Sequence, residues 1–227
     1  MAAAKKNQET KGVPFFNREL SWLEFQKRVL NEALDGNTKP LERLKFLCIV
    51  SSNFDEFFQV RVAALKRQVL SGDYSACPAG MSPPEQIAAI FRETRKVSTE
   101  QYRCLHEDVF PELAKNGLVF LHPRECREEQ SSFLGDLFEK EIFPALTPVR
   151  VEEGAPFPSA GNLNLHAAFL LEPREDVVDG REGPRVAVVR VPSSLPRILY
   201  LPGKDGRKYF TLLEYVVLDH AFRLFPG

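Results

Sequence analysis

Apolar residues in the first half of the chain recur at the three- and four-residue steps of amphipathic helices. This pattern predicts a helix that begins after Asn17, a good N-cap, and runs to about Leu34. Asp35-Gly36-Asn37 supplies its stop signal. The apolar positions of this helix form two neighbouring seams, Trp22/Phe25/Val29/Ala33 and Leu23/Leu30/Leu34.

Two further helices are expected in the first half. The second covers about 41–70. The third begins cleanly at Ser82, because Pro83 suits a first helical position and Glu85 completes a capping box. Three helices with short connections predict a small helical bundle. On the third helix the residues expected to face inward are Ile87, Ile90, Phe91, Val97 and Leu105.

Beyond Gly117 the pattern changes to short extended runs, and the last two are joined by the turn sequence Pro202-Gly203-Lys204-Asp205-Gly206. The predicted fold class is α + (α+β), an N-terminal helical bundle followed by a smaller α+β domain with a mainly antiparallel sheet. The expected organisation is a disordered tail over 1–13, a helical domain over 14–117 and an α+β domain over 118–227. Within the last domain we expect strands at 118–121, 146–151, 163–171, 185–191, 197–201 and 207–212, and helices at 127–142 and 212–224.

Composition and charge describe an ordinary soluble chain. Hydrophobic residues make up 44% of the 227 residues and charged residues 27%, which excludes a disordered protein and a disulfide scaffold. The net charge of −1 gives no general attraction for nucleic acid or anionic lipid, so neither is expected as a partner. The four cysteines and four histidines lack zinc-ligand spacing, and no metal site is expected. With no membrane span or secretory signal in the pattern, a cytoplasmic location is expected.

Asn53 is the one polar residue in a stripe of otherwise apolar positions on the second helix. If the helix continues through this point, a carboxamide lies within a buried face. An unpaired amide there would cost about 1–3 kcal/mol. A ligand in an aromatic-lined pocket is one possible partner, since a carboxamide offers the donor and the acceptor that read the edge of a purine base. The stripe consists of Phe46, Ile49/Val50, Asn53, Phe57, Val60 and Ala64.

A second interpretation of Asn53 needs no ligand. Asn53 is followed three residues later by Glu56, which is also a capping-box spacing. The helix could therefore break at 51–53 and restart, with Asn53 satisfying backbone N–H groups. Periodicity alone leaves both interpretations open.

The first half contains the blocks FNRELSWLEFQKRVLNEA (16–33), PLERLKFL (40–47) and SSNFDEFFQVRV (51–62). Through these blocks the chain resembles the N-terminal domain of bacterial polyphosphate kinase. The second half is similar to the middle domain of that family through Pro144-Ala-Leu-Thr-Pro-Val, residues 156–165 and residues 189–197. The resemblance covers about 14–225 and is strongest in the first half.

The resemblance implies a reversible transfer of the γ-phosphoryl group of ATP to polyphosphate through a phosphohistidine, with Mg²⁺ in the complete enzyme. It implies that the helical domain supports the adenine end of ATP. The adenine-contacting asparagine of the family falls on Asn53, which favours the ligand interpretation. Trp22, Phe54, Phe57 and Arg61 lie in the same blocks and are expected to pack or orient. For the complete enzyme the resemblance implies a homodimer, contacted in part through the middle domain, and leaves room for peripheral membrane association.

One departure limits what is expected of this chain alone. In the family, the nucleophilic histidine, the phosphate-clamping arginines and the Mg²⁺ site belong to two C-terminal, phospholipase D-like domains, to which nothing here corresponds. We therefore expect no catalytic residue and no phosphoacceptor among His106, His122, His166 and His220. The chain is expected to be an inactive, truncated part of a kinase. One alternative is a stand-alone interaction or regulatory module that associates with full-length kinase, and another is an unrelated helical plus α+β protein.

Overall fold

A computed structural model describes residues 15–151, 157–171 and 185–225 of the chain. By the contacts among its residues the chain divides into two compact units, Met1–Val109 (unit 1) and Phe110–Gly227 (unit 2). The predicted disordered tail over 1–13 lies outside the described residues. The domain limits expected from the sequence, 14–117 and 118–227, stay a prediction.

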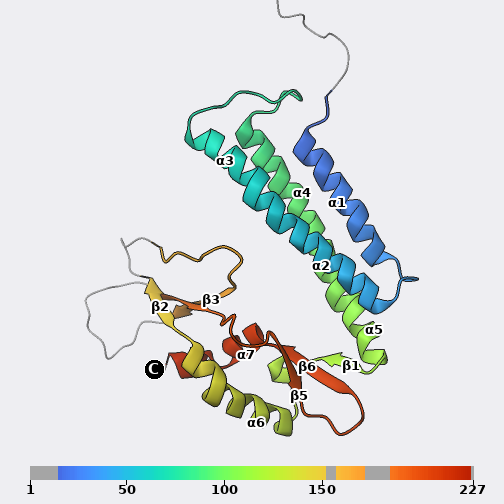
Figure 1. The fold of residues 1–227 in the computed structure, drawn as a ribbon, viewed down its shortest axis with the longest axis vertical. Helices are drawn as coiled ribbons and strands as arrows, with labels where there is room; N and C mark the ends of the chain where they lie inside the picture. Colours follow the sequence, from blue (N-terminus) through green and yellow to red (C-terminus); the bar gives the residue numbers. More distant parts are fainter. Residues whose placement is uncertain (1–14, 152–156, 172–184, 226–227) are drawn as a thin grey trace, which may run out of the picture. The chain divides into compact units, whose positions relative to one another are not determined.

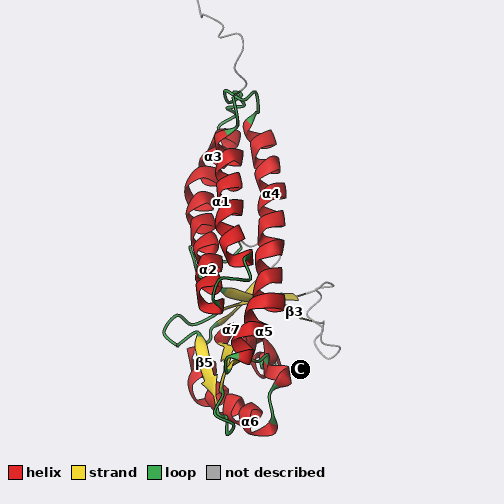
Figure 2. Ribbon diagram, turned by 90° about the vertical axis from the view of Figure 1, so that its right-hand side faces the viewer, coloured by secondary structure: helices red, strands yellow, loops and turns green. Residues whose placement is uncertain are grey.

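Unit 1 is a bundle of long antiparallel helices, as the hydrophobic pattern predicts (Figures 1 and 2). Helix α1 packs against α2 and α4, and α3 packs against α4. Its elements are α1 (Arg18–Leu34), α2 (Pro40–Phe57), the π-helical turn η1 (Phe58–Val62), α3 (Ala63–Leu70), α4 (Pro83–Arg103) and the π-helical turn η2 (Cys104–Val109).

Both predicted helix starts are confirmed, and one of them also ties two helices together. The side chain of Asn17 accepts a hydrogen bond from the Leu20 backbone N–H, with a 3.0 Å separation. Its Nδ2 donates to Oε1 of Gln86 on α4 over 2.8 Å. At the start of α4 the backbone N–H of Ser82 donates to the Glu85 carboxylate over 2.8 Å. These bonds satisfy polar groups that a helix end otherwise leaves open.

The π-helical turn η1 changes which residues of the second long helix face the bundle. Up to Phe57 the buried positions follow steps of three and four, and then the next buried position is Val62, five residues on. A π turn holds one extra residue, so the buried stripe shifts by one position there. Val60 is 54% exposed for this reason, and the expectation that Val60 and Ala64 face inward is wrong. Phe91 on α4, also expected inside, is 47% exposed.

Glu93 of α4 joins two helices through a pair of lysines. Its carboxylate lies 2.8 Å from Nζ of Lys27 on α1 and 2.7 Å from Nζ of Lys96 one turn further along α4. These two hydrogen bonds, the one from Lys27 foremost, lower the pKa of Glu93 to about 2. An ordinary glutamate carboxyl titrates near pH 4.3 in an unfolded chain, about 2 units higher.

We predict that the stability contributed by Glu93 depends on pH. Because the folded pKa is lowered, the contribution is complete above about pH 5 and is lost as the pH falls towards 2. Urea midpoints of the wild-type chain and of Glu93→Gln should therefore differ at pH 6 and converge progressively as the pH falls from about 5 towards 2. Lys96→Met should move this convergence to higher pH. A difference that stays constant between pH 6 and pH 3 would contradict the assignment.

Unit 2 is an α+β unit, which confirms the predicted fold class, but its strands form two sheets rather than one. The strand orders are β1-β6-β5 and β2-β4-β3, each three-stranded. All pairs are antiparallel except β1 with β6, which is parallel. The strands are β1 (Leu118–Phe120), β2 (Pro148–Val151), β3 (His166–Leu171), β4 (Arg185–Arg190), β5 (Ile198–Leu201) and β6 (Lys208–Leu212).

The helical segments of unit 2 follow the predicted positions, with short turns at their ends. Two predicted helices appear in more than one piece: 127–142 as α6 with η4, and 212–224 as α7 with α8. The segments are α5 (Phe110–Lys115), η3 (Pro123–Glu125), α6 (Glu128–Leu137), η4 (Phe138–Ile142), η5 (Phe143–Ala145), α7 (Leu213–Asp219) and α8 (Ala221–Leu224).

The turn sequence between β5 and β6 forms the predicted hairpin. The two strands pair antiparallel from Ile198 with Leu212 to Leu201 with Tyr209. Gly206 has a φ of +77°, a conformation that glycine adopts without steric cost. The hydroxyl of Tyr209 donates to the Asp205 carboxylate over 2.7 Å and so holds the loop against its own strand.

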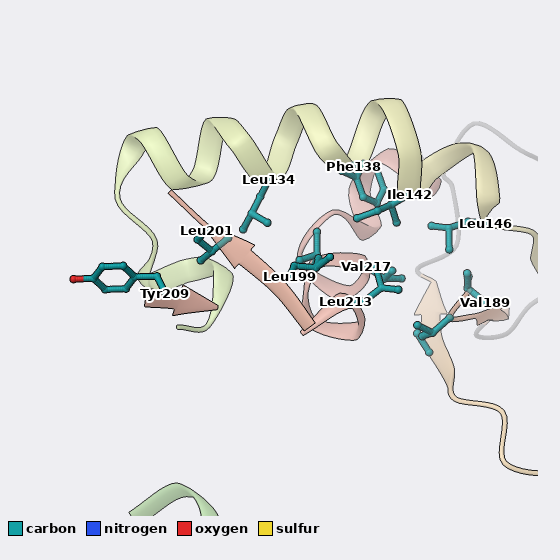
Figure 3. Close-up of a cluster of buried hydrophobic side chains, with 13 residues drawn as sticks. Leu134, Phe138, Ile142, Leu146, Val189, Leu199, Leu201, Tyr209, Leu213 and Val217 are labelled. Carbon is teal, nitrogen blue, oxygen red and sulfur yellow. The ribbon is translucent and has the colours of Figure 1, made fainter. Parts of the chain in front are cut away.

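The core of unit 2 forms where α6 and η4 cover strands from both sheets (Figure 3). Phe138 lies at its centre, and its ring stacks on His220 with centroids 4.5 Å apart.

In the part of the chain that the structure describes, no helix is both long and apolar enough to cross a lipid bilayer.

Candidate functional site

Asn53 lies on an unbroken helix, so the interpretation of this residue as a cap is wrong. Helix α2 runs from Pro40 to Phe57 with no interruption at 51–53. The side chain of Asn53 is half-buried and crosses to α1, where its Nδ2 donates a hydrogen bond to Oε1 of Gln26 over 2.9 Å. The carboxamide therefore has a protein partner on one side. Among the described residues, no hydrogen bond reaches its Oδ1.

A pocket of about 550 Å³ lies in unit 1 beside this pair of amides. Its walls come from α1 and from the helical stretch 53–64, which contributes the end of α2, the turn η1 and the start of α3. The π turn matters for its composition, because the shift in register leaves Val60, Arg61 and Ala64 on the pocket side. The lining residues are Arg18, Trp22, Phe25, Gln26, Asn53, Glu56, Phe57, Val60, Arg61 and Ala64.

An aromatic stack forms part of the pocket wall. The rings of Trp22 and Phe57 are 4.2 Å apart between centroids and almost parallel, with an interplanar angle of 3°. Phe57 is buried, whereas Trp22 keeps part of its surface accessible. Flat π-surfaces of this kind bind planar rings by stacking. The pocket thus combines a stacking surface with a carboxamide, a combination that suits a planar heterocyclic ring.

Positive charge borders the same pocket. Arg18 and Arg61 both line it, and both lie near Oε1 of the buried Glu19. The Nη2 of Arg18 is 2.9 Å from this oxygen, and the Nη1 of Arg61 is 3.7 Å from it. Glu19 therefore holds two guanidinium groups at one side of the pocket, where they could meet an anionic group attached to a base.

Most of the residues singled out in the sequence come together here, but the amide that pairs with Asn53 was missed. Asn53, Trp22, Phe57 and Arg61 all line the pocket, whereas Phe54 packs behind Trp22 with ring centroids 6.1 Å apart. Gln26 was not predicted. A signal for it exists, since it lies midway between Leu23 and Leu30 on one apolar seam, the same kind of polar interruption that drew attention to Asn53.

The histidines do not gather into a site. His220 stacks on Phe138 in the core of unit 2, and Nδ1 of His166 lies 3.1 Å from the backbone oxygen of Asn164. His106 and His122 stand at exposed or partly exposed helical turns. Over the described ranges, no group of three or more His, Cys, Asp and Glu side chains is placed to hold a metal ion.

Comparisons with known proteins agree over almost the whole chain. A family model described as "Polyphosphate kinase N-terminal domain" matches residues 15–121, and one described as "Polyphosphate kinase middle domain" matches residues 129–227. Polyphosphate kinase from Thermosynechococcus vestitus is 42% identical over 94% of this chain, and that from Halalkalibacterium halodurans 44% identical over 93%. The chain spans 29% and 30% of the length of these two relatives.

A solved structure has a similar fold. The crystal structure of polyphosphate kinase from Porphyromonas gingivalis is similar with a TM-score of 0.79 and 29% identity, over 96% of this chain and 31% of that one. These matches exclude the alternative of an unrelated helical plus α+β protein. The chain therefore belongs to the polyphosphate kinase family, of which it carries the N-terminal and middle domains.

Proposed function

We propose that this chain provides the adenine side of the ATP site in an enzyme that transfers the γ-phosphoryl group of ATP reversibly to polyphosphate. The names of its relatives support the reaction. The single observation that supports the site is the half-buried carboxamide of Asn53 beside the stacked rings of Trp22 and Phe57.

The base is held by two kinds of interaction in this proposal. Stacking on an aromatic ring contributes about 1–3 kcal/mol per base and accepts any base, because every base has a π-face. The carboxamide of Asn53 adds a hydrogen bond to the edge of the ring. Arg18 and Arg61 extend positive charge from the same pocket towards the phosphates.

The chemical step is proposed to take place on other domains of the complete kinase. The family resemblance assigns the phosphorylated histidine, the phosphate clamp and the Mg²⁺ site to domains outside the two that this chain matches. We propose no phosphoacceptor among its four histidines, and we propose that the chain alone is inactive. For the complete enzyme we propose a cytoplasmic homodimer with ATP and polyphosphate as substrates. A separate regulatory module is not favoured, since both matched domains are those of kinases.

The test is a titration of the chain with ATP that reads out the pocket directly. Trp22 is the single tryptophan of the sequence, so its indole N–H gives one signal in a nitrogen-15 NMR spectrum. We expect ATP to shift this signal with a weak affinity. Asn53→Ala should weaken the affinity about five- to tenfold, which corresponds to one hydrogen bond of about 1 kcal/mol or slightly more.

A matched substitution separates this role from a general effect on α1 and α2. Asn31 is exposed on α1 and does not line the pocket, so Asn31→Ala should leave the affinity for ATP unchanged. The proposal fails if ATP leaves the indole signal of the wild-type chain in place, or if Asn53→Ala binds ATP as tightly as Asn31→Ala does.

A further inference from the structure

We propose that Gln26 makes the pocket selective for adenine, because it fixes which end of the Asn53 carboxamide faces the base. The inference rests on the proposed function, since it concerns the same pocket. It assigns to Gln26 a role in positioning Asn53 and no role in the phosphoryl transfer itself.

Gln26 is the most deeply buried polar side chain of the pocket. It lies on α1 between Leu23 and Leu30 and is 1% exposed. Its Oε1 accepts the hydrogen bond from Nδ2 of Asn53 over 2.9 Å. Water does not compete for a bond in this position, and a buried amide oxygen without a donor would be costly. In the structure Asn53 is the donor of this bond and Gln26 is the acceptor.

This arrangement decides what Asn53 offers to a ligand. A carboxamide has N–H donors at one end and a carbonyl acceptor at the other. With the nitrogen of Asn53 directed at Gln26, its Oδ1 is the end left for the pocket, and no described residue donates to it. The pocket thus presents a hydrogen-bond acceptor beside the aromatic stack.

An acceptor at this point distinguishes the purine bases. Adenine carries an amino group at C6, which donates a hydrogen bond, whereas hypoxanthine and guanine carry a carbonyl at C6, which accepts. A carbonyl facing Oδ1 of Asn53 would set two acceptors against each other. Stacking on Trp22 and Phe57 does not distinguish these bases, so the preference must come from the amide. We expect ATP to bind about tenfold more tightly than ITP, which corresponds to a difference of about 1.4 kcal/mol in binding free energy.

The experiment measures the ratio of ITP to ATP dissociation constants by the Trp22 indole signal of the chain. ITP differs from ATP at C6, where a carbonyl replaces the amino group, and at N1, which carries a proton in hypoxanthine. It lacks the extra amino group of guanine, so the comparison is confined to this edge of the base. Gln26→Met keeps an unbranched side chain of similar length but removes the acceptor that holds Asn53. The amide can then turn, and we expect the ratio to fall from about 10 to below about 2 while ATP still binds.

A second buried glutamine serves as the control. Gln101 on α4 is 7% exposed, donates to the Leu47 backbone oxygen over 2.8 Å and does not line the pocket. Gln101→Met should therefore weaken folding in a similar way while it leaves the ratio near 10. If Gln26→Met does not fold, the wild-type ratio still tests the selectivity, because an unmodified chain that binds ITP as tightly as ATP overturns the inference.

The outcomes separate this inference from the proposed function. If ATP binds in a way that depends on Asn53 but the ratio is the same in the wild-type chain and Gln26→Met, the positioning role is wrong and the adenine site stands. If ATP does not move the Trp22 signal, the proposed adenine site is wrong, and the inferred selectivity for adenine is then wrong as well. A higher affinity for ITP than for ATP would show that Asn53 presents its nitrogen instead.

Discussion

Phe138→Ala is expected to lower the free energy of unfolding of unit 2 by about 4 kcal/mol. Phe138 is fully buried at the start of η4, where the core cluster of unit 2 surrounds it (Figure 3). Its ring also stacks on His220, with centroids 4.5 Å apart and planes 19° from parallel. Truncation removes the transfer free energy of the ring and leaves a cavity that helices packed on two sheets cannot close. Such phenylalanine truncations cost about 3–5 kcal/mol.

The measurement is a urea titration followed by far-ultraviolet circular dichroism, with Phe133→Ala as the control. Phe133 is on α6, one turn and one residue before Phe138, and is 40% exposed. The same chemical change there should cost less than about 1.5 kcal/mol, since 40% of the surface of Phe133 is already exposed and its loss leaves no enclosed cavity. Equal losses for the two variants would mean that Phe138 does not lie at the centre of the core.

Arg43→Met should lower the stability of unit 1 by about 2–3 kcal/mol. Arg43 lies in the first turn of α2 and is 2% exposed. Its Nε donates over 2.6 Å to the backbone oxygen of Ala33, in the last turn of α1, and its Nη2 lies 3.5 Å from the Asp108 carboxylate on η2. Three helical segments of unit 1 thus meet at one guanidinium group, and methionine can fill its volume but cannot donate a hydrogen bond.

Unit 1 carries its own probe for this prediction, since its Trp22 is the only tryptophan of the chain. Urea midpoints from tryptophan fluorescence should fall clearly for Arg43→Met. The control is Arg103→Met, which removes an arginine that pairs with Glu100 at the surface of α4. An exposed ion pair contributes about 0.2–1 kcal/mol, so its midpoint should change little. A loss for Arg103→Met that matches the loss for Arg43→Met would contradict the structural role of the buried arginine.

The parts of the fold that the sequence predicts well are those decided by neighbouring residues. Asn17 and Ser82 mark helix starts because a cap acts on backbone groups two or three positions away. The hairpin at 202–206 is predictable for the same reason, since the turn residues and the flanking strands are adjacent in sequence. The overall class follows from the change of period beyond Gly117.

The parts that the sequence does not predict depend on distant partners. Nothing near Leu118 indicates that β1 pairs with residues 208–210, so the division into two sheets could not be foreseen. The regular helical period does not reveal the π turn η1, which places Val60 at the surface. Phe91 shows a third limit, because an aromatic at a helical step can lie at the edge of a packed face and remain half exposed.

The residues of the candidate site could likewise be predicted only in part. Asn53 could be found because a polar residue interrupts an apolar stripe, and the family resemblance then gave it a role. Periodicity could not decide between a helix break and a continuous helix at this point, and the structure shows the continuous one. Gln26 interrupts its own stripe equally, but the significance of each amide depends on the other, 27 positions away in the chain.

The π turn at Phe58–Val62 also has a consequence for how this helix tolerates insertions and deletions. Each residue of an α-helix turns the chain by about 100°, so deletion of one residue within η1 would let the helix run on in regular α geometry and keep α3 in its present orientation. The same deletion within α2 (Pro40–Phe57) would rotate everything beyond it and carry Leu65 out of the bundle. Length variation among related helices should therefore collect at this turn, where the side chains of the pocket change while the bundle keeps its register.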